Sequence, residues 1–110
     1  MNTEIAVDRL AALAQPSRLA VFRLLVQRGR DGLPAGEIAT QLGIAPNALS
    51  FHLKELSRAG LLQARPDGRY IHYAADFAAM NQLLGYLTEH CCAGGAADPA
   101  CIEATGCTTC

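Results

Sequence analysis

The sequence predicts a mainly α-helical domain with one β-hairpin, in the order α-α-α-α-β-β-α. Apolar residues recur at helical spacing through most of the first 60 positions, β-branched and aromatic residues flank a "PDG" turn at 66–68, and helical spacing returns from residue 76. With 110 residues and 51% hydrophobic side chains, the chain is long enough to bury one modest core. We therefore expect one folded domain.

The first two predicted helices are amphipathic. Residues 4–14 carry Ile5, Leu10 and Leu13 at near-helical spacing, and Pro16 ends this run. The segment "PSRLAVFRLLVQRG" then begins with a proline, which suits the first turn of a helix, and closes on a glycine. Its predicted apolar face consists of Leu19, Phe22, Leu25 and Val26.

The next two segments predict a helix-turn-helix. "PAGEIATQLG" is a short helix that ends at Gly43, and "APNALSFHLKELSRAG" is a longer one that places Leu49, Leu53 and Leu56 toward the core. A tight "GIAP" turn joins them. In this arrangement the second helix enters the major groove of DNA and uses its N-terminal residues on base edges.

A two-stranded β-ribbon and a last helix follow. "LLQAR" and "RYIHYAA" predict strands joined by the "PDG" turn, in the place of a wing. "DFAAMNQLLGYLTEH" predicts a helix with Asp76 as its N-cap. Its apolar stripe consists of Phe77, Met80, Leu83, Leu84 and Leu87. The complete order of elements is that of a winged helix-turn-helix.

The distribution of charge favours a nucleic-acid partner for the first part of the chain. Residues 1–74 hold all nine Lys and Arg against six acids, and residues 75–110 hold four acids and neither Lys nor Arg. An ordinary solvated surface would also explain this pattern. No signal peptide or apolar run of membrane-spanning length is visible, so we expect a cytoplasmic protein with no membrane partner. The sequence shows no nucleophile–base pair and no phosphate-binding glycine loop, so it does not predict an enzyme.

Seven residues are candidate DNA contacts. Asn47, Ser50 and Lys54 avoid the leucine stripe of their helix and suit base edges or phosphates, although any small helical domain can expose such residues. His52 has two interpretations, a DNA contact or a half-buried packing residue. The complete set is Asn47, Ser50, Phe51, His52, Lys54, Arg58 and Arg69.

At "LSFHLKELSRAGLLQARPDGRYIHY" the sequence resembles the ArsR/SmtB family of bacterial metal-responsive winged-helix repressors. The resemblance extends over about residues 8–90 and includes "ALAQPSRLAVFRLL" and the "S.HL..L..AGL" core. It implies a homodimer, formed by the first and last helices, on the two half-sites of a palindromic double-stranded operator. The predicted stripes on residues 5–13 and 77–87 suit such an interface.

All five cysteines lie in the last twenty residues, which predicts a winged helix-turn-helix domain over 1–92 and a flexible, effector-binding tail over 93–110. The family's arsenical sensors typically carry cysteines in the third helix, where "EIATQLG" has none. Its zinc sensors use paired ligands along the last helix, but Ala78 stands where a histidine would follow Asp76. The "CC" pair with one downstream cysteine resembles the family's atypical arsenical repressors.

The predicted effector is trivalent arsenic, As(III), bound by Cys91, Cys92 and Cys101. Thiolates select soft ions, and three sulfurs suit a trivalent one. Antimonite, Sb(III), and methylarsenite stay open as effectors. Cys107 and Cys110 are less favoured ligands, but with Cys91 and Cys92 they could complete a four-sulfur Zn or Cd site. A redox switch, a tail without a sensing role, and a metal-storage module that does not bind DNA stay open as well.

Overall fold

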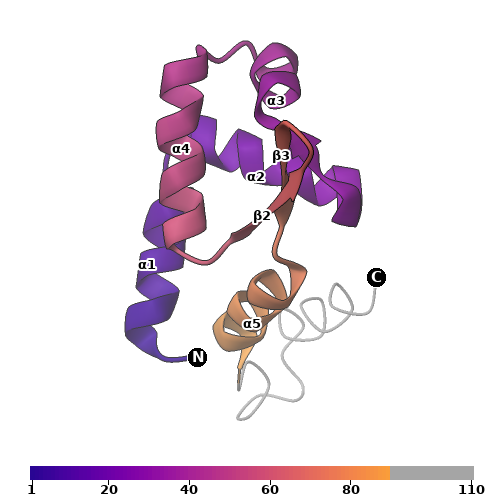
Figure 1. The fold of residues 1–110 in the computed structure, drawn as a ribbon. Coiled ribbons are helices and arrows are strands. Elements are labelled where there is room, and N and C mark those ends of the chain that lie inside the picture. Colours follow the sequence, from indigo (N-terminus) through magenta and orange to yellow (C-terminus); the bar gives the residue numbers. More distant parts are fainter. Residues whose placement is uncertain (90–110) are drawn as a thin grey trace.

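The computed structural model describes residues 1–89 and has the predicted winged helix-turn-helix fold (Figure 1). Within these residues, the helices are α1 (Thr3–Leu13), α2 (Pro16–Arg28), α3 (Ala35–Leu42), α4 (Pro46–Arg58) and α5 (Phe77–Thr88), with one 3₁₀ turn, η1 (Gly29–Asp31). The strands are β1 (Leu33–Pro34), β2 (Leu62–Asp67) and β3 (Tyr70–Ala75). Each helix begins and ends within two residues of its predicted position.

Side-chain caps hold the beginnings of the two terminal helices. The Asn2 carboxamide accepts a hydrogen bond from the Ile5 amide at 2.9 Å, and the Asp76 carboxylate accepts one from the Ala79 amide at 3.0 Å. Both bonds satisfy an amide that the first turn of a helix leaves without an intrahelical partner. The second bond confirms the predicted N-cap of α5.

The prediction of a two-stranded ribbon was incomplete. The wing is a three-stranded antiparallel sheet in the order β1-β3-β2, in which Leu33 pairs with Tyr73. Strand β1 has two residues, too few to show a periodic pattern, and its Pro34 is acceptable because β1 lies at the edge of the sheet. The extra strand ties the segment after α2 to the hairpin.

The largest side chains of the core come from α2, α3, α4 and the segment before β2, and buried residues of α1 and the three strands complete it. Its largest fully buried members are Leu25, Ile38, Leu49, Leu56, Leu61 and Val21. Phe22 and Leu25 of α2 are buried as predicted, but Leu19 is 44% exposed and the centre of the buried face includes Val21. All of the fully buried side chains in residues 1–89 are apolar.

The backbone at Gly32 leads to a stability prediction. Gly32 has φ +67°, and a Cβ atom added there would lie 2.1 Å from the carbonyl oxygen of Tyr73. Because that oxygen belongs to the backbone of β3, the clash adds to the conformational strain, and Gly32→Ala should lower the free energy of unfolding by about 2–6 kcal/mol. Urea denaturation monitored by circular dichroism measures the change.

Gly29 supplies the matched control for Gly32. It also has a positive φ, +79°, but an added Cβ would meet no atom within 4 Å. Because its ψ of −157° also lies in a region that only glycine readily adopts, Gly29→Ala should cost the conformational strain alone, about 1–3 kcal/mol. Equal losses in the two variants would contradict the proposed clash with β3.

Candidate nucleic-acid interface

The α3–turn–α4 unit presents one side of α4 outward. Gly43 ends α3 in the left-handed conformation, φ +64°, and the Ile44 amide donates to the Ala39 carbonyl oxygen at 3.1 Å. This compact turn joins the two helices at the top of Figure 1, where α4 lies beside α3. The leucine stripe on the inner side of α4 is buried, as predicted, and consists of Leu49, Leu53 and Leu56. The opposite side of α4 is therefore free to face a ligand.

Four predicted DNA contacts lie on this outer side of α4. Asn47, Ser50 and Lys54 are exposed, and Phe51 has 55% of its surface exposed. Within residues 1–89, no hydrogen bond or ion pair involves the side chains of Asn47, Ser50 or Lys54. Amide, hydroxyl and ammonium groups that are not used within the domain are available to base edges and phosphates.

His52 lies at the margin of the core. Its ring is half-buried and meets the Phe51 ring edge-on, with 5.9 Å between centroids and an interplanar angle of 64°. The Nδ1 atom is buried and has no hydrogen-bond partner in the described part of the chain. The burial of Nδ1 favours the packing interpretation for that edge of the ring. If His52 contacts DNA, it must do so through Nε2.

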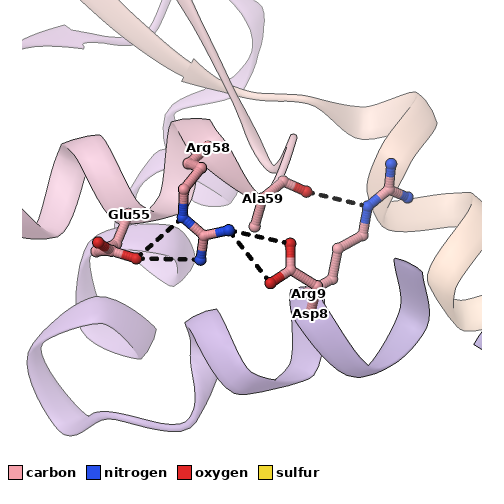
Figure 2. A network of polar contacts seen from close by, with 5 residues as sticks. All are labelled: Asp8, Arg9, Glu55, Arg58 and Ala59. Atoms are coloured by element: carbon pink, nitrogen blue, oxygen red, sulfur yellow. Dashed lines mark hydrogen bonds and ion pairs between the residues drawn. The ribbon is translucent and has the colours of Figure 1, made fainter. Parts of the chain in front are cut away.

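Arg58 lies in the last turn of α4 and is already paired with carboxylates (Figure 2). Its guanidinium is 3.1 Å from Glu55 Oε2 and 3.3 Å from Asp8 Oδ1. Hydrogen bonds to Glu55 and then Asp8 raise the pKa of Arg58 above its ordinary value. A DNA phosphate would have to compete with both acids for the Arg58 guanidinium. The structure therefore favours Lys54 over Arg58 as a DNA contact.

The tip of the wing carries Arg69. Asp67 pairs with Tyr70 across a two-residue loop, Gly68–Arg69, in which Gly68 has φ +63°. The side chain of Arg69, a predicted DNA contact, is exposed there. Sequence reasoning did not single out Tyr70, which is 66% exposed beside it. An aromatic residue directly after a hairpin loop is the signal that could have identified it.

A second exposed surface lies on α1 and α5. These helices are neighbours, since the hydroxyls of Thr3 and Tyr86 are hydrogen-bonded and Arg9 donates to Gln82 at 3.4 Å. Between 41% and 57% of the surface of each of its five large apolar side chains is exposed, namely Ile5, Val7, Leu10, Leu84 and Leu87. A groove of about 440 Å³ beside them is lined mainly by apolar side chains of α1, α2 and α5. Exposed apolar surface of this extent typically marks an interface.

The predicted metal ligands lie outside the described residues. Cys91, Cys92, Cys101, Cys107 and Cys110 all fall in 90–110. In residues 1–89 no group of three His, Cys, Asp or Glu side chains is placed to hold a metal ion. None of the helices in these residues is long and apolar enough to cross a membrane. The Asp76 carboxylate caps α5 and accepts from Gln63 Nε2 at 3.4 Å.

Comparison with known proteins agrees with this geometry. Residues 13–63 match a family model described as a helix-turn-helix domain. The chain is 33% identical to the nodulation protein NolR of Rhizobium meliloti, over 80% of this chain and 70% of that protein. It is 32% identical to the HTH-type transcriptional regulator CmtR of Mycobacterium bovis, over 94% of this chain and 93% of that protein.

Solved structures share the fold. An ArsR-like transcriptional regulator from Rhodococcus sp. RHA1 superposes with a TM-score of 0.71 at 28% identity, over 91% of both chains. A possible transcriptional regulator for arsenical resistance gives 0.64 at 30% identity, over 73% of this chain and 80% of that one. The homodimeric winged helix-turn-helix DNA-binding domain of Mb0332 from Mycobacterium bovis gives 0.63 at 27% identity, over 79% and 81%.

The fold and the exposed face of α4 define a winged helix-turn-helix protein of the DNA-binding class. More particularly, the chain belongs to the ArsR/SmtB family of winged-helix transcriptional regulators, which confirms the resemblance seen in its sequence.

Substitutions at two residues of α4, Phe51 and Leu53, should distinguish an effect on DNA binding from an effect on folding. Phe51 is 55% exposed and Leu53 is 3% exposed. Phe51→Ala should therefore change the free energy of unfolding by less than about 0.5 kcal/mol while weakening DNA binding. Leu53→Ala should instead lower it by about 2–5 kcal/mol. Thermal melts and gel retardation of the same preparations measure the two effects, and a large loss of stability in Phe51→Ala would place this ring in the core.

Proposed function

We propose that this protein is a homodimeric transcriptional repressor that binds a two-fold symmetric operator through α4 and releases it when trivalent arsenic binds cysteine thiolates. The observation that carries the DNA-binding part is the outer side of α4, where Asn47, Ser50 and Lys54 have no partner in the described domain. Reading of base edges by the N-terminal residues of such a helix is the usual mode of the helix-turn-helix.

The apolar surface on α1 and α5 supports a dimer. Ile5, Leu10, Leu84 and Leu87 are each at least 41% exposed, and a second copy would remove this surface from water. The similar domain from Mycobacterium bovis is homodimeric. A two-fold dimer places its two α4 helices on two half-sites, with centres about 34–36 Å apart on one face of the DNA.

Binding to a palindromic promoter fragment tests the role of α4. Asn47→Ala or Ser50→Ala should each weaken specific binding by about 1–3 kcal/mol, because each removes a side-chain contact to DNA. Gel retardation at two salt concentrations measures the loss and separates base contacts from phosphate contacts.

Ser57 provides the matched control. It is also a serine of α4, two helical turns beyond Ser50 and only partly exposed. Because the N-terminal part of a recognition helix lies deepest in the groove, Ser57→Ala should leave operator affinity unchanged. If Asn47→Ala and Ser50→Ala bind as tightly as the unmodified protein, α4 does not lie in the groove.

The cysteines of residues 91–110 support the effector part of the proposal. Soft thiolates favour thiophilic ions, and trivalent arsenic is satisfied by three sulfurs, which Cys91, Cys92 and Cys101 supply. The similar protein described as a possible regulator for arsenical resistance also supports this choice. The reducing cytoplasm, where such a repressor acts, would keep these thiols unpaired. Antimonite, methylarsenite, zinc and cadmium are the competing effectors.

Cysteine substitutions test the ligand set. Single Ser substitutions at Cys91, Cys92 or Cys101 should leave operator binding intact but abolish its loss on adding arsenite, because two sulfurs cannot complete the trivalent site. The double variant Cys107→Ser/Cys110→Ser should still release DNA. Fluorescence anisotropy of a labelled operator during titration with each of the five ions measures release.

The same titration distinguishes the competing ligand sets and functions. If the Cys107→Ser/Cys110→Ser variant stays on DNA, the ligand set includes that pair, as a four-sulfur zinc or cadmium site requires. A protein that binds arsenite but retards no promoter fragment would be a storage module. Release requires that the ion bind free protein more tightly than operator-bound protein, since equal affinities shift nothing.

A further inference from the structure

Arg9 of α1 contacts the end of α4 and the first half of α5. Its Nε donates to the Ala59 carbonyl oxygen at 3.2 Å, and its Nη1 donates to the Ala79 carbonyl oxygen at 3.3 Å and to Gln82 Oε1 at 3.4 Å. Figure 2 shows the side chain reaching from α1 to Ala59. One partly buried guanidinium thus joins a helix of the proposed dimer interface to the helix proposed to read DNA.

The contact at Ala59 holds the end of α4 in place. Ala59 is the C-cap of this helix, and the carbonyls at a helix C-terminus have no intrahelical partner. A cation there is also favoured by the helix dipole. The guanidinium lies against the next residue as well, because a Cβ added at Gly60, φ +82°, would be 3.5 Å from Arg9 Nη2.

A backbone hydrogen bond also links the beginning of α5 to the segment that follows α4. The Asp76 amide, at the beginning of α5, donates to the Leu61 carbonyl oxygen at 2.8 Å. Asp76 also caps α5, so this bond connects the first turn of α5 to the segment that leaves α4. A shift of α5 relative to α1 would therefore strain the contacts of Arg9 and move the end of α4.

We infer that Arg9 is the positioning residue that couples effector binding after α5 to the placement of α4 on DNA. This inference rests on the proposed function. It differs from the proposed dimer contacts, because Arg9 acts within one protomer and reaches α4. The neighbouring Asp8–Arg58 pair also joins α1 to α4, but its side chains are 45% and 55% exposed, where solvent screens the attraction.

Arg9 variants test the coupling, defined as the ratio of operator dissociation constants with and without arsenite. In the unmodified protein this ratio should be about 5–150-fold, the usual range for such switches. Arg9→Met keeps the length of the side chain but removes every donor, and should lower the ratio to about a fifth or less of its original value. Arg9→Lys should be intermediate, because an ammonium lacks the fork that reaches several acceptors at once.

Tyr86→Phe is the matched control. It removes the hydrogen bond between Thr3 and Tyr86, which joins α1 to α5 without touching α4, and should leave the ratio unchanged. Equal loss of coupling in Tyr86→Phe and Arg9→Met would assign the effect to α1–α5 pairing and overturn the role of Arg9. So would an unchanged ratio in both Arg9→Met and Arg9→Lys.

Amide hydrogen exchange without effector gives a second readout. Arg9→Lys, which keeps the charge, should speed exchange in the last turn of α4 and the first turn of α5, and Tyr86→Phe should not. If arsenite fails to release DNA from the unmodified protein, the proposed effector is wrong, whereas unchanged exchange at both helix ends contradicts the role of Arg9 itself. The two failures are therefore distinguishable.

Discussion

The burial of the leucine stripe of α4 is the contact on which the rest of the structure depends. Leu49, Leu53 and Leu56 are at most 3% exposed and pack with residues of α2 and α3. Because a helix has 3.6 residues per turn, fixing these three side chains inward fixes the rotation of the helix about its axis. The outward direction of Asn47 and Ser50 follows from hydrophobic packing on the other side.

The size of the domain explains why it leaves apolar surface uncovered. Its core is filled mainly by α2, α3 and α4, and α1 and α5 each have only two buried residues, Ala6 and Ala12 in α1 and Ala79 and Leu83 in α5. Small domains have too little interior to cover every amphipathic helix. Val7 at 57% and Leu87 at 53% exposure are the result, and a second copy is the partner that would complete the structure.

The helix α1 therefore has two sides with different tasks. Its apolar residues Ile5 and Leu10 face away from the domain, whereas Asp8 and Arg9 reach the end of α4. In the proposed dimer, the relation between the two protomers and the placement of α4 would therefore depend on the same helix. For the proposed repressor this is the dependence that an effector would need, because release requires two arrangements of different DNA affinity.

Local patterns in the sequence determined the helices, the hairpin turn and the N-cap at Asp76, because these depend on neighbours a few positions away. They also determined which side of α4 is exposed. The strand at Leu33–Pro34 depended on tertiary structure, since two residues show no period and their partners in β3 lie far along the chain. The contacts of Arg9 and Arg58 also depended on tertiary structure, because each side chain bonds to a residue 50 positions away in the chain. Side-chain periodicity specifies which face of an element is apolar, but only packing of the elements specifies which polar groups meet across them.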